Sequence, residues 1–528
     1  MGTYLNPGNS GFERIVRSGY IDKTGMIDLV NRRIGTTDNL ICISRPRRFG
    51  KSYAARMLCA YYDYTCDSHG LFDDKAVSIS DKYEEHINKY NVVYLDISGI
   101  ISLMMRREVN IKNISRFIAS ELRKELIESY PALERIDDVT ACLVECVKLS
   151  KKQFVFIIDE WDAVIREAKD DSETQKAYLN LLREWFKNGN VTSQIVAAAY
   201  MTGILPIKKD GSESAISDFK EFTILQPGPF VRYTGFTESE VKTLCEQYNM
   251  SFDQAKQWYD GYDFRRCEPI YNPYSVMMAM QMGEFKSYWR KTSAAESLKT
   301  YVGMNMDNLQ DKILRLIAGE PVEVYTEDFE NDFETFNSSD DVLTLMIHLG
   351  YLVYDDETSQ ARIPNEELRR EFKRLIQRPS NKRLSDLISD SEQLLQDTLN
   401  GNETAVAEKI ERVRETNYAP MFYNNEQALR YVIKFAYIIC IDYYLKVEEL
   451  PTGKGIANVV FIPKRDTALP AMIVELKWNE TSESTLEQIK KRNYPAILNG
   501  YVGEMVLVGI NYDEKTKIHS CNIERIEL

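Results

Sequence analysis

Residues 40–52 read LICISRPRRFGKS, an apolar run that turns into a short basic segment and ends in Gly-Lys-Ser. We expect a buried strand over 40–44, a tight turn, and a helix over 51–63. The first turn of a helix carries unpaired N–H groups and partial positive charge, so it binds anions. The stretch therefore predicts a phosphate-binding loop, in which Lys51 reaches the β- and γ-phosphates of ATP and Ser52 binds Mg²⁺.

The loop differs from the general pattern G-x-x-x-x-G-K-[ST], because Arg45 occupies the position of the first glycine. The residues that follow make the loop stiffer and more cationic, and positive charge beside phosphate groups is chemically reasonable. We predict nucleotide contacts from the whole loop, namely Arg45, Pro46, Arg47, Arg48, Phe49, Gly50, Lys51 and Ser52. An ordinary strand–turn–helix without a ligand is the alternative for this segment taken alone.

A second motif, FVFIIDE at residues 154–160, favours the phosphate-binding loop over the ordinary strand–turn–helix. Its five apolar residues suit a central parallel strand that is buried on both faces. Asp159 then emerges at the carboxyl end of the strand, where open α/β sheets bind ligands. We predict that Asp159 holds the Mg²⁺ and its waters and that Glu160 polarises an attacking water. A core strand that ends in a solvated acidic turn is the alternative.

The rest of the first half alternates strands with helices, which predicts a parallel sheet with crossover helices. The expected strands are 92–97 and 194–201, and the expected helices include 111–128, 138–150 and 172–188. Thr202 follows the strand over 194–201 and is a candidate γ-phosphate sensor, with a plain strand-end threonine as the alternative.

Beyond Pro229 the pattern becomes helical and aromatic-rich. Helices are expected over 237–260, 272–283, 306–318, 339–349 and 366–377, with a small hairpin formed by 349–356 and 361–365. Helices followed by a two-stranded hairpin resemble a winged helix, which either binds DNA or packs against the preceding domain. The predicted domains are an ATPase core (1–228), a helical lid with winged-helix-like region (229–380), a helical linker (381–420) and a carboxyl-terminal domain (421–528).

The composition fits a soluble, acidic, multidomain protein. The chain has 528 residues and a net charge of −14, so any contact with nucleic acid must be local, through a basic groove. The nine cysteines are scattered, which favours a reducing cytoplasm. No segment is long and apolar enough to span a membrane; the nearest, 431–445, is interrupted by Lys434 and Asp442 and predicts a buried helix.

The carboxyl-terminal domain, 421–528, is expected to run from a helix into strands over 453–463 and 470–479, a helix over 484–498 and a strand over 502–512. Its second strand, over 470–479, carries Glu475 and Lys477 on one face. A Glu-x-Lys strand suits metal-dependent phosphodiester hydrolysis, because the carboxylate holds Mg²⁺ and the lysine steadies the water or the phosphate charge. The preceding strand normally adds a second carboxylate, and here Asn458 occupies that place; the helix residue Glu426 is a further candidate ligand.

Taken together, SRPRRFGKS, FVFIIDEWD, Thr202-Gly203-Ile204, WYDGY (258–262), YNPYS (271–275) and VELK (474–477) resemble one family over nearly the whole chain. The chain resembles bacterial AAA-ATPase-like proteins that carry a carboxyl-terminal PD-(D/E)XK nuclease-superfamily domain. The resemblance implies a RecA-like P-loop ATPase core with a lid and winged helix, followed by a restriction-endonuclease-like α/β domain.

The same resemblance implies roles for particular residues. The Arg-Pro-Arg-Arg-Phe-Gly-Lys-Ser loop is the usual form in such proteins, with Asp159 and Glu160 as the hydrolytic pair. Glu475 and Lys477 would be catalytic, Glu426 a metal ligand, and Gln488 and Tyr494 the residues of the following helix. The family pattern has Asp where this chain has Asn458, and this departure puts nuclease metal binding in question.

Three functions follow as hypotheses. The chain is an ATPase that acts on DNA or RNA through an active nuclease domain, a nucleotide-gated protein that holds nucleic acid without cutting it, or a signalling or assembly ATPase. The expected ligands are ATP and Mg²⁺, and a homo-oligomer is compatible with each hypothesis. Arg265 and Arg266 are candidates for an arginine finger, with solvated surface arginines as the alternative.

Overall fold

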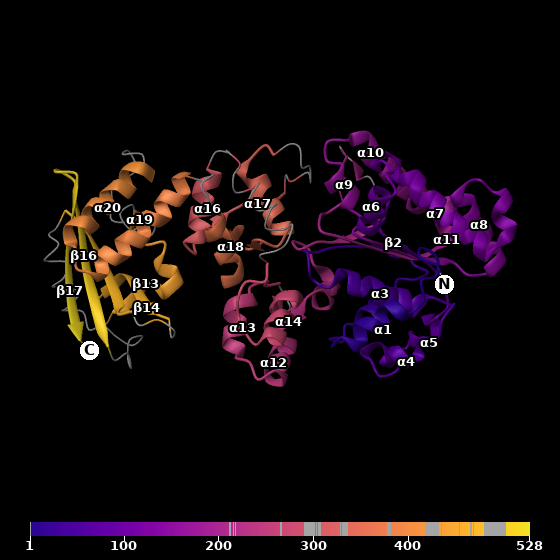
Figure 1. Cartoon of the computed structure of the whole chain (residues 1–528), viewed down its shortest axis with the longest axis horizontal. Coiled ribbons are helices and arrows are strands. Elements are labelled where there is room, and N and C mark those ends of the chain that lie inside the picture. The colour runs from indigo at the N-terminus through magenta and orange to yellow at the C-terminus, as the bar shows by residue number, and fades with distance from the viewer. Residues whose placement is uncertain are drawn as a thin grey trace. The chain divides into compact units, whose positions relative to one another are not determined.

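The computed structural model divides into two compact units, Met1–Leu298 with Glu323–Arg370 and Lys299–Val322 with Glu371–Leu528 (Figure 1). It describes residues 2–527 apart from 208, 211–212, 215, 217, 265–266, 290–300, 302–303, 305–307, 328, 330–335, 377–381, 418–431, 434–435, 453–454, 465–466, 468 and 480–502. Within the described residues, no helix has both the length and the apolar character needed to cross a membrane.

A five-stranded sheet forms the centre of the first unit, in the order β2-β3-β4-β1-β7. All four pairings are parallel. The strands are β1 (Leu40–Ser44), β2 (Asn91–Asp96), β3 (Phe154–Asp159), β4 (Val196–Gly203) and β7 (Lys220–Phe222). Every residue of β1, β3 and β4 is buried, as their continuous apolar runs require. The predicted parallel sheet with crossover helices is confirmed.

Helices cover both faces of this sheet (Figure 1). Alternate residues of each strand enter two separate cores: Leu40 and Phe156 pack into one, and Ile41 and Ile157 into the other. On one face lie α1 (Ser10–Arg17), α2 (Gly25–Asn31), α3 (Lys51–Tyr62), α4 (His69–Phe72) and α5 (Tyr83–His86). On the other lie α6 (Ile97–Arg106), α7 (Ile114–Ser129), α8 (Val139–Ser150), α9 (Ala163–Glu167), α10 (Ser172–Phe186) and α11 (Gly189–Ile195).

The boundaries of β4 differ from the prediction of a strand over 194–201. Gln194 and Ile195 still belong to α11, so the strand starts at Val196. It extends through Thr202 and Gly203, which pair with Ile43 and Ser44 of β1. Thr202 is therefore still part of the sheet. It lies beside the carboxyl end of β1, the strand that leads into the predicted phosphate loop.

The remaining part of the first unit is mainly helical. It contains α12 (Glu238–Gln247), α13 (Phe252–Tyr259), α14 (Pro273–Met282), α17 (Ser339–His348), β11 (Val353–Asp355), β12 (Gln360–Arg362) and the start of α18 (Glu366–Ile376), with β8 (Phe236–Thr237) paired to β9 (Ile270–Tyr271). The predicted order of helix, hairpin and helix is present as α17, β11–β12 and α18. Tyr262 donates a hydrogen bond to the carbonyl of Gly350 at 2.6 Å, and Asn365 donates to that of Asp260 at 2.8 Å, so this region packs on segment 260–263.

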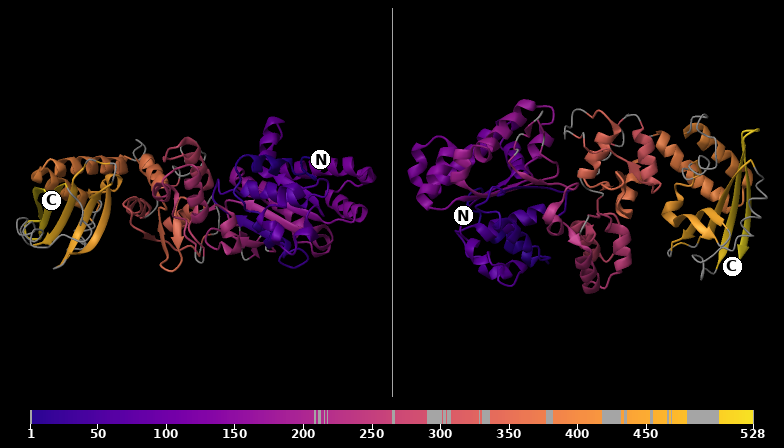
Figure 2. Two further views of the ribbon diagram at one scale, coloured as in Figure 1. Left: turned by 90° about the horizontal axis from the view of Figure 1, so that it is seen from below. Right: turned by 180° about the vertical axis from the view of Figure 1, so that it is seen from behind.

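The second unit is built on a mixed five-stranded sheet in the order β13-β14-β15-β16-β17. The strands are β13 (Tyr444–Thr452), β14 (Gly455–Pro463), β15 (Ala471–Trp478), β16 (Glu504–Asp513) and β17 (Ile518–Glu527). Only β15 and β16 run parallel. The helices are α16 (Leu309–Ile317), α19 (Lys382–Leu399), α20 (Glu403–Asn417) and α22 (Cys440–Tyr443). Figure 2 shows α19 and α20 along one face of this sheet.

The sequence predicted β14, β15 and β16 but neither β13 nor β17. The helix expected over 431–445 was wrong at its end, because the chain enters β13 at Tyr444. The helix expected over 484–498 lies outside the described residues.

Candidate functional site

The predicted phosphate loop connects the end of β1 to the start of α3. Gly50 is the residue before the helix, and its φ of 84° lies in the left-handed region that glycine adopts without steric conflict. Arg48 also has a positive φ, of 71°. The turn is thus tight enough to present the first N–H groups of α3, beginning at Lys51, to the carboxyl edge of the sheet.

Lys51 points back into this loop. Its Nζ donates hydrogen bonds to the carbonyls of Arg45 at 2.9 Å and Pro46 at 2.8 Å, and the side chain is buried. Burial lowers the pKa of Lys51 to about 8, against the opposing charges of Glu160 and Asp159. The ammonium group and the acidic pair therefore share one local environment, although Lys51 begins α3 and the acidic pair lies at the end of β3.

Four strand ends meet at this edge. The sheet register aligns Asp159 with Asp96 of β2 on one side and with Thr202 of β4 on the other, and Thr202 with Ile43 of β1. Asp159 is buried, and among the described residues its Oδ1 atom has no hydrogen-bond partner. Burial raises the pKa of Asp159 to about 6, while a hydrogen bond from Ser52 and the charge of Lys51 lower it in part.

Glu160 directly follows β3 with a φ of 52°. The Ser98 hydroxyl donates to its Oε2 atom, and Arg166 Nη2 donates to the same atom at 3.1 Å. Burial acts to raise the pKa of Glu160, but the Ser98 hydrogen bond and the Arg166 charge outweigh it, so the pKa lies below its ordinary value. The sequence analysis predicted a role for neither Ser98 nor Arg166. Each lies in a helix that begins shortly after a strand of the sheet, and this position is the sequence feature that could have indicated a place near the site.

Arg45 has its hydrogen-bond partners inside the protein. Its guanidinium donates to the carbonyls of Ser44 and Phe222, both at 2.9 Å, to that of Pro227 at 3.1 Å, and to the hydroxyl of Thr234 at 3.1 Å. The residue is 1% exposed, and burial lowers its pKa to about 10. Arg45 thus ties the start of the loop to the segment after β7, and its predicted contact with the nucleotide stays a prediction.

Two aromatic side chains pack on the next part of the loop. The ring of Phe49 meets the ring of Tyr262 edge-on at 5.1 Å, and the Arg48 guanidinium lies 3.8 Å from the ring centre of Tyr274. These tyrosines belong to the WYDGY and YNPYS segments, whose position in the fold was not predictable from spacing. Pro46 packs beside Gly350, where a Cβ atom would lie 2.6 Å from the proline ring. Arg47 is partly exposed.

The nuclease-like motif lies on the sheet of the second unit. Glu475 is 1% exposed, and Lys477, on the same face of β15, is partly exposed. Their neighbours in β16 are Gly509 and Asn511. Val459 pairs with Val474, so Asn458 and Glu475 are the next positions on the two strands. Glu426, Gln488 and Tyr494 lie outside the described residues.

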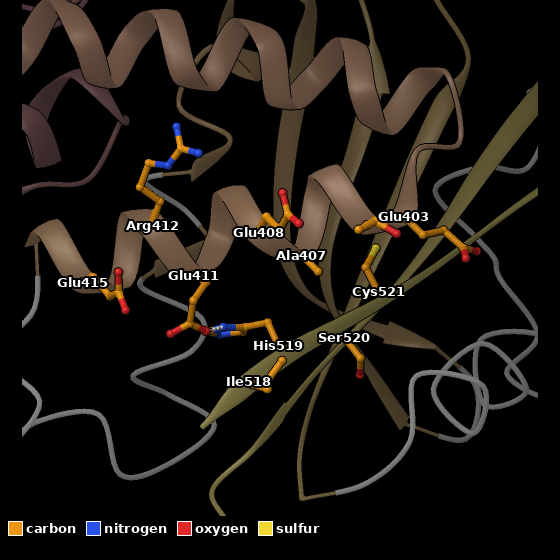
Figure 3. Close-up of a pocket in the computed structure, with 11 residues that line it drawn as sticks. Glu403, Ala407, Glu408, Glu411, Arg412, Glu415, Ile518, His519, Ser520 and Cys521 are labelled. Carbon is orange, nitrogen blue, oxygen red and sulfur yellow. Dashed lines mark hydrogen bonds and ion pairs between the residues drawn. The ribbon is translucent and has the colours of Figure 1, made fainter. Parts of the chain in front are cut away.

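A cavity of about 550 Å³ lies between α20 and β17 in the same unit (Figure 3). His519 and Cys521 point from β17 toward α20, and the Glu411 carboxylate accepts a hydrogen bond from the His519 ring. His519 and Cys521 pair with Tyr512 and Ile510, which alternate with the positions beside Glu475. The cavity therefore lies on the opposite face of the sheet from Glu475 and is separate from the nuclease-like motif.

The strand order, the loop after β1 and the acidic pair after β3 define a P-loop ATPase-like domain in the first unit. Comparison of sequence families agrees: residues 7–212 match the family described as "Predicted AAA-ATPase", and residues 424–521 match the PD-(D/E)XK nuclease superfamily. The chain therefore contains an AAA-ATPase-like domain over residues 7–212 and, toward the carboxyl terminus, a domain of the PD-(D/E)XK nuclease superfamily over residues 424–521.

One curated relative is an "Uncharacterized protein in vnfD 5'region" of Azotobacter chroococcum mcd 1, 22% identical over 336 residues. The match covers 63% of this chain and spans about three fifths (60%) of the relative.

Similar solved structures include the ORC2 protein of Aeropyrum pernix (13% identity; 67% of this chain and 93% of that chain; TM-score 0.28) and Cdc6p of Pyrobaculum aerophilum (13%; 67% and 93%; 0.23). The Aeropyrum pernix ORC1 protein in complex with DNA is 11% identical, with 69% and 95% coverage and a TM-score of 0.24. At these scores the assignment of fold rests on the sheet order and the family matches.

Proposed function

We propose that the first unit binds ATP with Mg²⁺ at the carboxyl edge of its sheet and hydrolyses it. The observation that carries this proposal is the convergence of Lys51, at the start of α3, with Asp159 and Glu160, at the end of β3, so close that their charges shift one another's pKa. A buried lysine beside two carboxylates at the start of a helix suits a triphosphate, whose phosphates need cationic and N–H donors on one side and a metal ion on the other.

The donor set fits Mg²⁺. Ser52 and Asp159 would hold the ion, since Mg²⁺ prefers carboxylate and hydroxyl oxygens. The Oδ1 atom of Asp159 is buried and accepts no hydrogen bond from the described residues, which leaves it available to a hard cation or to a water bound to one. The ion would neutralise charge that develops on the phosphates during transfer.

For hydrolysis, Glu160 supplies the base. Its carboxylate is ionised near neutral pH, because its pKa lies below the ordinary value, and its side chain is one third (33%) exposed at the sheet edge. In the reaction a water oxygen bonds to the γ-phosphorus, the bond from that phosphorus to the ADP oxygen breaks, and Glu160 takes the proton. Thr202, at the neighbouring strand end, would donate to the γ-phosphate.

We further propose that ATP turnover serves an action on nucleic acid through the second unit. The support is the nuclease-superfamily domain together with Glu475 and Lys477 on one face of β15. A second candidate function is nucleotide-dependent binding of nucleic acid without cleavage. Asn458 favours it, because a neutral amide at the position beside Glu475 is a weaker ligand for a divalent cation than a carboxylate.

The test of the ATPase proposal uses two substitutions in the full chain. Lys51→Ala should weaken ATP binding at least ~100-fold, because it removes the cation that faces the phosphates. Glu160→Gln should retain ATP affinity within about threefold and lower kcat by roughly 100- to 1,000-fold, since the amide cannot accept the proton. Equilibrium binding and phosphate release measure the two effects.

Lys112→Ala is the matched control, because this lysine is 67% exposed and should change neither quantity. An unchanged Kd for ATP in Lys51→Ala would remove the phosphate loop from the proposal. A normal turnover rate in Glu160→Gln would remove Glu160 as the base.

A further inference from the structure

The two oxygens of the Glu160 carboxylate have different surroundings. Both hydrogen bonds that described residues make to this carboxylate fall on Oε2, one from Ser98 and one from Arg166. The side chain is 33% exposed. The carboxylate is therefore held by one oxygen, while Oε1 accepts no hydrogen bond from the described residues.

Arg166 is itself held in place. Its side chain is 12% exposed, and its Nε donates to Asp162 Oδ2 at 3.2 Å. Asp162 is fully buried and also accepts the backbone N–H groups of Ile204 at 3.1 Å and Leu205 at 3.2 Å. The Arg166 guanidinium thus binds both Glu160 and Asp162, and Asp162 in turn binds the backbone that directly follows β4.

The backbone beyond Thr202 is fitted closely to this arrangement. A Cβ atom at Gly203 would lie 2.7 Å from Trp161 Nε1 and 2.9 Å from Asp162 Oδ1. Glycine at 203 lets the turn that carries Trp161 and Asp162 approach β4. Asp162, which holds Arg166, is therefore packed tightly against the end of β4.

We propose that Arg166 is a positioning residue for hydrolysis: with Ser98 it fixes Glu160 through Oε2 and leaves Oε1 to accept the proton of the attacking water. This inference rests on the proposed ATPase function. A glutamate has three rotatable side-chain bonds, and a base must lie within hydrogen-bond distance of the proton that it removes. Two donors on one oxygen restrict the carboxylate to orientations that direct the other oxygen toward the triphosphate.

The alternative is that Arg166 only neutralises the buried carboxylate of Asp162. The two roles differ in what they change. A structural role predicts loss of stability with little effect on kcat once the protein is folded. A positioning role predicts a fall in kcat at unchanged ATP affinity, and a dependence of that fall on the presence of the Glu160 carboxylate.

The experiment is a double-mutant cycle on the full chain, with kcat, KM and the Kd for ATP measured for each variant. Arg166→Met should lower kcat about 10- to 100-fold with the Kd changed less than about threefold. Arg166→Lys, which keeps the charge, should recover part of the loss. In a Glu160→Gln background Arg166→Met should cause little further fall, because the group that it positions is gone.

Ser98→Ala tests the second donor and covers the case in which Arg166→Met does not fold; it should lower kcat about fivefold at unchanged Kd, as expected for the loss of one hydrogen bond from an uncharged donor. Arg17→Met, at a 75% exposed arginine, is the matched control. A normal kcat in both Arg166→Met and Ser98→Ala overturns the positioning role. So does a fall in kcat on Arg166→Met that is as large in the Glu160→Gln background as in the wild-type chain. A wild-type chain that binds no ATP overturns the ATPase proposal itself.

Discussion

The phosphate-loop edge of the first unit and the Glu475 face of the second unit differ in how their polar residues are fixed. At the edge, four strand ends lie side by side, and Arg45, Lys51, Glu160 and Asp162 all have identified hydrogen-bond partners. On the Glu475 face, the motif consists of two positions on one strand, and the next strand carries Asn458 at the position next to its last paired residue, Val459. The comparison teaches that parallel topology assembles a site from distant motifs, whereas a short motif on one strand defines only a face.

The largest expected effect tests how firmly the edge is fixed. Arg45→Met removes the donors that the carbonyls of Ser44, Phe222 and Pro227 share, and should destabilise the first unit by about 3 kcal/mol. Urea unfolding followed through Trp161 and Trp185 measures the change. Arg47→Met, at a partly exposed position of the same loop, should stay within about 0.5 kcal/mol. Equal effects from the two variants would show that the loop is not anchored through Arg45.

The next largest effect is expected on the Glu475 face of the second unit. Asn458→Asp restores a carboxylate beside Glu475 and should raise Mg²⁺- or Mn²⁺-dependent nicking of plasmid DNA at least ~10-fold over wild type, since charged oxygens bind these ions more tightly. The double variant Asn458→Asp with Glu475→Gln should return to the wild-type level. Absence of cleavage of any DNA or RNA by Asn458→Asp would mean that this domain binds or organises rather than cuts.

The smallest effect sharpens the account of the loop. The Arg48 guanidinium lies 3.8 Å from the ring centre of Tyr274, and Tyr274 is 37% exposed. A double-mutant cycle of Arg48→Met and Tyr274→Leu should give a coupling of roughly 0.5–1 kcal/mol in the free energy of unfolding. A coupling near zero would mean that Tyr274 does not hold the loop.

The sequence predicted the parts of the fold whose signals are local. The apolar runs before Arg45 and Asp159 correctly indicated buried parallel strands, and Gly50-Lys51 marked the start of α3. Gln194 and Ile195 were assigned to β4 because a buried isoleucine suits both a helix end and a strand start. The edge strand β17, with sequence IHSCNIERIE, mixes charged and apolar residues and gave no strand signal.

The site was predictable to a similar extent. Motif spacing predicted that Lys51, Asp159 and Glu160 belong to one site, and the parallel sheet brings the start of α3 and the end of β3 together. The buried position of Arg45 and the hydrogen bonds of Arg166 depend on contacts between segments that are distant in sequence, such as the carbonyl of Pro227 or the turn after Thr202. Sequence spacing carries no information on such contacts, so these roles emerge only from the folded chain.

The central claim is that Lys51 and the acidic pair after β3 face one bound triphosphate. A crystal structure of the full chain with Mg²⁺ and a slowly hydrolysed ATP analogue tests it most directly. The account predicts phosphates at the start of α3 within hydrogen-bond distance of Lys51, the ion between Ser52 and Asp159, and a water between Glu160 Oε1 and the γ-phosphate. Nucleotide bound elsewhere on the chain, with Lys51 still bonded to the carbonyls of Arg45 and Pro46, would contradict it.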